Sequence, residues 1–103
     1  MNDVDILKRL RAKIGAEFHY ALDDDRCTEL SLASTDFIFH GLIRHYSTSE
    51  KAEIVALIAR LEHLRVLDLR RNLLLVLPES FGNLTQLTYL DLGSNWLGKV
   101  PAW

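Results

Sequence analysis

The chain begins with a stretch in which hydrophobic residues recur at the spacing of one helix face. They lie three, three and four residues apart, at Val4, Leu7, Leu10 and Ile14. Residues with this spacing fall on a single side of a helix. Asn2 or Asp3 is suited to cap the start of that helix, and Gly15 is suited to end it. The pattern predicts a helix over about residues 3–14.

From residue 17 the spacing changes to alternation, and a second helical pattern follows later. Large hydrophobic residues alternate at 18, 20 and 22 and again at 30 and 32, on either side of three aspartates at 23–25. This predicts a β-hairpin. Ser47 and Glu50 have the spacing of a capping box, and the hydrophobic residues after them recur at three and four, which predicts a helix over about 48–60. Residues 38–43 fit a short helical turn or an extended loop.

The remainder of the chain repeats itself. When residues 61–83 are set above residues 84–103, an offset of 23 aligns six hydrophobic positions and also Asp68 with Asp91, Asn72 with Asn95, and Pro78 with Pro101. Amphipathic helices do not explain this pattern, because both prolines would break them and both asparagines would fall on the apolar side. The chain therefore contains a repeat whose unit must bury its leucines against neighbouring units.

The repeat resembles a known family. Residues 61–78 follow the spacing L-x-x-L-x-x-L-x-L-x-x-N-x-L-x-x-L-P, which resembles the leucine-rich repeat family and, within it, the 23-residue class with an L-P-x-x-F-G-N-L segment. The resemblance implies that each repeat forms one short parallel strand and returns on the opposite side. It implies an α/β fold, a leucine-rich repeat solenoid (a right-handed βα superhelix), here with an N-terminal helix plus β-hairpin as its cap.

A degenerate copy of the repeat precedes these two. Residues 27–37 align with residues 64–74, so that Leu30 takes the place of Leu67 and Leu32 that of Leu69, whereas Thr35 replaces Asn72. We therefore expect a cap at 1–26 and repeats over 27–103. The repeats divide into a long copy with its own helix on the convex side at 27–60, a regular copy at 61–83 and a partial copy at 84–103.

Composition narrows the functional classes. The chain has 103 residues, of which 20 are leucine, 49% are hydrophobic and 25% are charged, and its formal net charge is −2. This balance gives no basic footprint for nucleic acid or an anionic membrane. No run reaches 18 hydrophobic residues, and the charged N-terminus lacks the hydrophobic core of a secretory signal. Cys27 alone cannot form an internal disulfide, so we expect a reducing compartment, the cytoplasm.

Candidate chemistry is sparse. The four histidines and the aspartates at 23–25 have no spacing typical of a zinc or calcium site. Cys27 occupies a core position, and no serine stands in a G-x-S-x-G segment. We therefore expect a protein that is not an enzyme and that uses no metal or cofactor.

The resemblance implies a binding surface on the concave side, where the variable strand positions face outward. Stacked strands would align three rows there, and the residues expected to bind are Glu29, Ser31, Val66, Asp68, Arg70, Tyr89 and Asp91. The expected function is a non-catalytic protein–protein interaction module. Alternatively, Asp68 with Arg70 and Asp91 with Arg71 only neutralise one another. The chain could also be the recognition segment of a larger signalling protein, a leucine-rich repeat GTPase or ligase.

The last repeat suggests a third function, self-assembly. Residue 103 falls part-way through a repeat, so either the array continues or the edge of the last coil pairs with another molecule. We expect a homo-oligomer formed through Leu90, Leu92, Trp96, Leu97, Val100 and Trp103. Trp96 either seeds that contact or packs against Val100 or Trp103 within its own coil.

Overall fold

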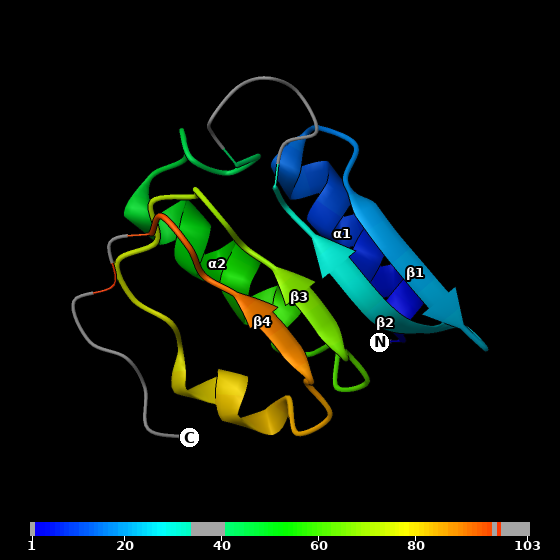
Figure 1. Ribbon diagram of the computed structural model, residues 1–103. Coiled ribbons are helices and arrows are strands. Elements are labelled where there is room, and N and C mark those ends of the chain that lie inside the picture. The colour runs from blue at the N-terminus through cyan, green and yellow to red at the C-terminus, as the bar shows by residue number, and fades with distance from the viewer. Residues whose placement is uncertain (1, 34–40, 96, 98–103) are drawn as a thin grey trace.

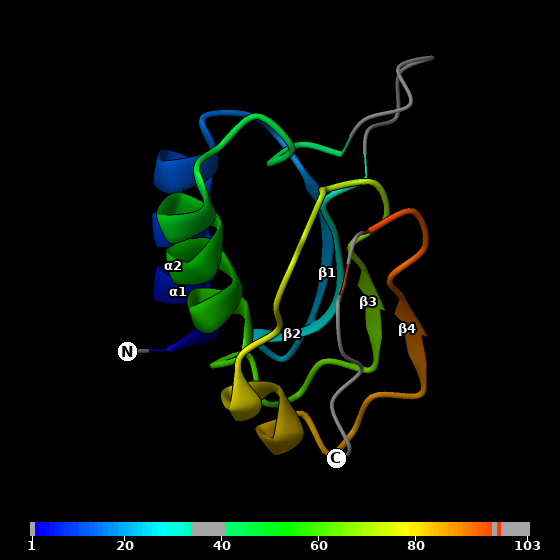
Figure 2. The same cartoon turned by 90° about the vertical axis from the view of Figure 1, so that its left-hand side faces the viewer.

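A four-stranded sheet with helices on one face forms the fold (Figure 1). The computed structural model describes residues 2–33, 41–95 and 97. The strands are β1 (His19–Asp23), β2 (Arg26–Ser31), β3 (Val66–Asp68) and β4 (Tyr89–Asp91), side by side in that order. The helices α1 (Asp3–Ile14) and α2 (Thr48–Ile58) lie against one face, and no described element covers the other (Figure 2). The chain is therefore a mixed α/β protein.

Helix α1 forms where the spacing predicts it. The Asn2 side chain accepts a hydrogen bond from the Asp5 N–H at 2.9 Å, and Gly15 ends the helix with a left-handed φ of 71°. Asp3 does not cap; its carboxylate accepts the N–H of Cys27 at 2.8 Å and so ties α1 to β2. Ile6 joins the core with Leu7, Leu10 and Ile14, whereas Val4 is only half-buried.

The predicted hairpin is confirmed and leads directly into the parallel sheet. Strands β1 and β2 are antiparallel and joined by Asp24 and Asp25, both with positive φ, as the twist of a two-residue hairpin requires. Strands β2, β3 and β4 then run parallel, with Leu30 opposite Leu67 and Leu67 opposite Leu90. This is the register that the repeat alignment predicts, including the degenerate copy.

The two helical segments opposite the sheet differ in length. Helix α2 begins with the complete capping box of Ser47 and Glu50 and ends at Ile58, two residues earlier than expected. The regular repeat has only the 3₁₀ helix η1 (Glu79–Asn83) at the equivalent place, with Phe81 buried. Residues 42–45 form a turn, while residues 38–40 lie outside the described part of the chain.

One interior connects all these elements. The buried residues include Leu10 of α1, Leu30 of β2, Ile58 of α2, and Leu67 and Leu69 of the regular repeat, each 0–1% exposed. Cys27 lies among them, at the core position that its alignment with Leu64 predicts. These side chains come from successive coils, a coil being one strand together with the segment that follows it on the opposite side. No single coil could bury its own side chains without the next.

Two asparagine side chains join successive coils through backbone hydrogen bonds. Asn72 is fully buried: its Oδ1 accepts the N–H of Ile43 at 2.9 Å, and its Nδ2 donates to the carbonyls of Leu69 and Arg70. Asn95 repeats the arrangement one coil later, since its Oδ1 accepts the N–H groups of Asn72 and Leu74. Each amide thus satisfies backbone groups that the strands cannot reach.

The backbone passes unusually close to one of these amides. A Cβ atom placed on Gly41 would lie 2.2 Å from Oδ1 of Asn72, far inside contact distance. The absence of a side chain at residue 41 therefore lets the long coil approach the Asn72 carboxamide. Thr35, which the alignment places at the corresponding asparagine position, lies outside the described residues.

Replacing Asn72 with alanine should destabilise the fold strongly. The variant would leave the buried N–H of Ile43 without its acceptor, whereas the carbonyl of Leu69 would keep the hydrogen bond from Asn95 Nδ2 at 2.8 Å. We expect a loss of roughly 2–4 kcal/mol in the free energy of unfolding. Urea unfolding followed by circular dichroism measures it. Asn83→Ala, at an exposed asparagine in η1, is the matched control and should change stability by less than about 0.5 kcal/mol. Equal effects of the two changes would contradict this role of Asn72.

Candidate functional site

The face of the sheet turned away from α1 and α2, here called the open face, presents aligned rows of side chains. The first row is Glu29, Val66 and Tyr89, and the second is Ser31, Asp68 and Asp91. Neighbouring strands hold successive members about 4.8 Å apart. A third row is formed by the residues just after the strands. There the backbone N–H of Arg71 donates to the carbonyl of Gly93, so the chains stay side by side beyond the strand ends. The structure therefore brings the sequence-predicted binding residues together on one face.

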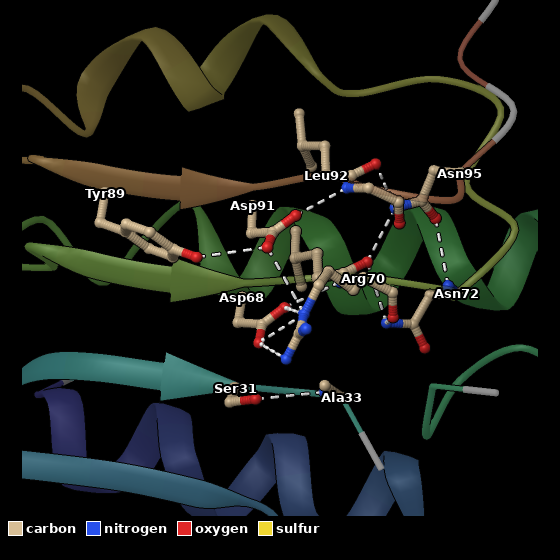
Figure 3. Close-up of polar contacts among 11 residues, drawn as sticks. Ser31, Ala33, Asp68, Arg70, Asn72, Tyr89, Asp91, Leu92 and Asn95 are labelled. Carbon is tan, nitrogen blue, oxygen red and sulfur yellow. Dashed lines mark hydrogen bonds and ion pairs between the residues drawn. The ribbon is translucent and has the colours of Figure 1, made fainter. Parts of the chain in front are cut away.

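The second row closes the turns that follow the strands. Ser31 Oγ accepts the N–H of Ala33 at 3.2 Å. Asp68 Oδ1 accepts the N–H of Arg70 at 3.0 Å, and Asp91 Oδ1 accepts that of Gly93 at 2.9 Å (Figure 3). The same side-chain-to-backbone contact thus recurs in three successive coils. These oxygens stabilise the turns, so they are less available to a partner.

Arg70 contacts two carboxylates of the open face, those of Asp68 and Asp91. Its Nε and Nη2 contact both carboxylate oxygens of Asp68 at 2.8–3.0 Å, and its Nε lies 3.5 Å from Asp91 Oδ2 (Figure 3). Hydrogen bonding to Asp68 is the main cause of the raised pKa of the Arg70 guanidinium. The expected neutralisation of Asp68 by Arg70 is confirmed, and the same guanidinium also reaches Asp91.

Tyr89 and Glu29 are accessible side chains of the first row. Tyr89 is 54% exposed, and its hydroxyl donates to Asp91 Oδ2 at 3.3 Å, which fixes the direction of the ring (Figure 3). Glu29 is exposed and Val66 is half-buried between them. Tyrosine and arginine are enriched in protein interfaces because they offer large, well-defined contacts. Together with Arg70, these residues give the open face accessible aromatic and charged side chains.

The structure adds two residues that the sequence prediction missed. Ala21 of β1 lies opposite Glu29, and His19 lies opposite Ser31, so each row continues onto a fourth strand. The hairpin was predicted, but its pairing was not, because the register shifts between Ala21 and Leu22. A two-residue turn at 24–25 fixes only Asp23 opposite Arg26; the irregularity carries no clear signal in the sequence.

The other predicted surface lies at the β4 edge of the sheet. Leu90, Leu92 and Leu97 are half-buried and pack against the core, while Trp96, Val100 and Trp103 lie outside the described residues. Beside β4, a hollow of about 470 Å³ is lined by apolar and polar residues, among them Phe81, Leu84, Leu87, Thr88 and Leu90. This edge therefore has some of the apolar character that the sequence predicts.

Cys27 is placed where a thiol is inert. Its side chain is buried, and burial, with a smaller contribution from the Asp3 charge, raises its pKa to about 12. Its Sγ donates to the carbonyl of Glu29 at 3.3 Å. Among the described residues no group of three or more histidine, cysteine, aspartate or glutamate side chains could hold a metal ion. Within that same part of the chain, no helix is long and apolar enough to cross a membrane.

The thiol of Cys27 should react only when the protein unfolds. At pH 8 a thiol with a pKa near 12 is almost entirely protonated, and burial keeps reagents away, so modification by Ellman's reagent should follow the unfolding rate. The folded pKa exceeds the ordinary value of 9.0, so stability should fall as the pH rises from about 9 towards 12. Rapid labelling in water at pH 8, at the rate seen in concentrated urea, would show that the site is open.

Comparison with known proteins supports the repeat. Residues 56–97 match the family model described as leucine rich repeat. This part of the chain is a leucine-rich repeat. The match includes the end of α2, all of β3, η1 and β4, and both asparagines that join the coils. Searches of curated proteins and of solved structures gave no significant match. The leucine-rich repeat therefore supplies the strands that carry Val66, Asp68, Arg70, Tyr89 and Asp91.

Proposed function

We propose that this chain is a non-catalytic protein–protein interaction module whose open face binds a protein partner. Leucine-rich repeats generally mediate protein interactions, and residues 56–97 match that family. The observation that carries the proposal is the alignment of Glu29, Val66 and Tyr89 across three parallel strands, with Tyr89 exposed and Arg70 beside it. Backbone pairing holds these side chains at fixed spacing, which reduces the entropy lost on binding.

The proposal includes a solenoid of the 23-residue class, with the open face as its concave side. In this proposal, residues 27–60, 61–83 and 84–103 form three coils of a right-handed superhelix, and residues 1–26 close its N-terminal end. The burial of Leu10 and the contact of Asp3 with the Cys27 N–H support the capping role, because both join α1 to the first coil. The free thiol of Cys27 supports a cytoplasmic, reducing location.

The capping role predicts that a cavity in α1 weakens the whole fold. Leu10 is completely buried, so Leu10→Ala should lower the free energy of unfolding by about 2–5 kcal/mol. Because the cap and the repeats share one interior, unfolding should remain a single transition by circular dichroism and by tyrosine and tryptophan fluorescence. Ala12→Gly, at an exposed site of the same helix, is the control and should cost about 1 kcal/mol. Separate melting of α1 and the repeats would contradict the proposed cap.

The proposed binding face can be tested by paired substitutions. Glu29→Ala with Tyr89→Ala removes two accessible side chains without touching the turn contacts of Asp68 and Asp91. Affinity capture with the parent chain should recover a partner protein. Titration calorimetry should then show that the double variant binds this partner at least tenfold more weakly than the parent chain does. The control pair, Lys8→Ala with Glu62→Ala, changes two exposed side chains outside the sheet. If the first pair of substitutions leaves the affinity for the partner unchanged and the control pair abolishes binding, the proposed face is refuted.

The β4 edge supports a second candidate, self-association. Strand β4 pairs only with β3 among the described strands, and the hollow beside it exposes parts of Leu87 and Leu90. This edge would then join a second copy, and Thr88→Lys, at an exposed residue lining the hollow, should weaken that contact. Light scattering at high micromolar concentration tests it, and a clean monomer would exclude it. Within a larger signalling protein, such as a leucine-rich repeat GTPase or ligase, the open face would instead serve as the recognition segment.

A further inference from the structure

Strand β1 is one of the two edge strands of the sheet, at the end opposite β4. It pairs with β2 only, and in the described part of the chain nothing lies beyond it (Figure 1). Its five residues, His19–Asp23, include no proline and no lysine, which are the residues that commonly protect a sheet edge from pairing with another chain. The edge is thus open to strand addition.

The backbone of β1 presents its hydrogen-bonding groups outward at alternate residues. The carbonyl of Ala21 faces β2, where it accepts from Thr28 Oγ1 at 3.5 Å. Since backbone groups alternate in direction along a strand, the N–H and C=O groups of Tyr20 and Leu22 face the free edge. An antiparallel strand centred on Ala21 would place Tyr20 and Leu22 in the hydrogen-bonded pairs.

The side chains of the same two residues are unusually exposed. Tyr20 lies opposite the buried Leu30, on the side of the sheet that α1 covers, yet it is 46% exposed and Leu22 is 43% exposed. Phe18 continues this row, with its ring centroid 5.8 Å from that of Tyr20. Helix α1 therefore covers the apolar row of β1 incompletely, and a second apolar strand beside it would bury the remainder.

The polar side chains at the two ends of β1 favour a second copy of this strand as the occupant, because an imidazole and a carboxylate can form a hydrogen bond. His19 and Asp23 stand two residues on either side of Ala21. If two copies of β1 run antiparallel with Ala21 opposite Ala21, each His19 faces the Asp23 of the second copy, and each Tyr20 faces the Leu22. The alternative register, with Tyr20 opposite Tyr20, places Glu17 opposite Asp23 at both ends. Each of these carboxylates already has a basic partner in its own chain, Arg11 and Arg65 respectively, and this register loses the contact between His19 and Asp23.

We propose that β1 pairs antiparallel with β1 of a second copy of this chain, about a two-fold axis through Ala21. The pairing would join two sheets into one of eight strands, with both open faces on the same side. The contact is short, well below the area of a standard protein interface. We therefore expect a reversible dimer with a dissociation constant on the order of 10–100 μM. The proposal is independent of the proposed partner on the open face.

A disulfide test resolves both the surface and the register. In the proposed pair, Ala21 lies directly opposite its copy, with Cβ atoms about 4.5–5.5 Å apart, so Ala21→Cys should form an intermolecular disulfide readily under mild oxidation. In Tyr20→Cys the two thiols lie diagonally, about 7–8 Å apart, and should cross-link at least tenfold more slowly. The buried Cys27 does not compete. Equal rates for the two variants, or faster cross-linking of Tyr20→Cys, would overturn the proposed register.

Charge reversal tests the same contact without cross-linking. His19→Asp places one aspartate opposite Asp23 at each end of the pair and should weaken the dimer about tenfold in sedimentation equilibrium. The double variant His19→Asp with Asp23→His should restore the parent affinity. Thr88→Lys, on the β4 edge, should leave the β1 dimer unchanged. A chain that stays at 11.8 kDa at 500 μM, or a dimer that Thr88→Lys abolishes and His19→Asp preserves, would refute pairing through β1.

Discussion

The structure depends on leucine side chains from neighbouring coils sharing one interior. A coil with a three-residue strand cannot enclose Leu67 and Leu69 by itself, so the burial of each coil requires the next. The inward side chains are thereby committed to stability, and function is left to the outward positions of the same strands. Asn72 and Asn95 reinforce this coupling, because their amides join the backbones of successive coils.

The repeat could be predicted in detail because its signal is redundant. Leucines, asparagines and prolines all give the same offset of 23, and that offset places Leu67 beside Leu90 without reference to any other element. Helix α1 and the capping box of α2 are local patterns and were equally clear. The register shift between Ala21 and Leu22 was not predictable, because the two-residue turn at 24–25 sets only the pairing next to it.

The binding face shows where prediction from residue type reaches its limit. Asp68 and Asp91 align with variable outward positions, yet both carboxylates accept a backbone N–H two residues later, as Ser31 does. Part of the hydrogen-bonding capacity of these carboxylates is therefore used to stabilise the turns. The sequence identifies the row but cannot show which members remain accessible, since that depends on where Arg70 and the Tyr89 hydroxyl point.

The close approach of Gly41 to Asn72 has a consequence for how this molecule can change over time. A methyl group at residue 41 would occupy the volume of the Asn72 carboxamide, so neither position can vary freely while the other keeps its present form. A larger residue at 41 therefore requires the side chain of residue 72 to move or to be smaller, which disturbs the hydrogen bond that Asn72 accepts from the Ile43 N–H. Two sites 31 residues apart in the chain are in this way coupled, because they share one volume.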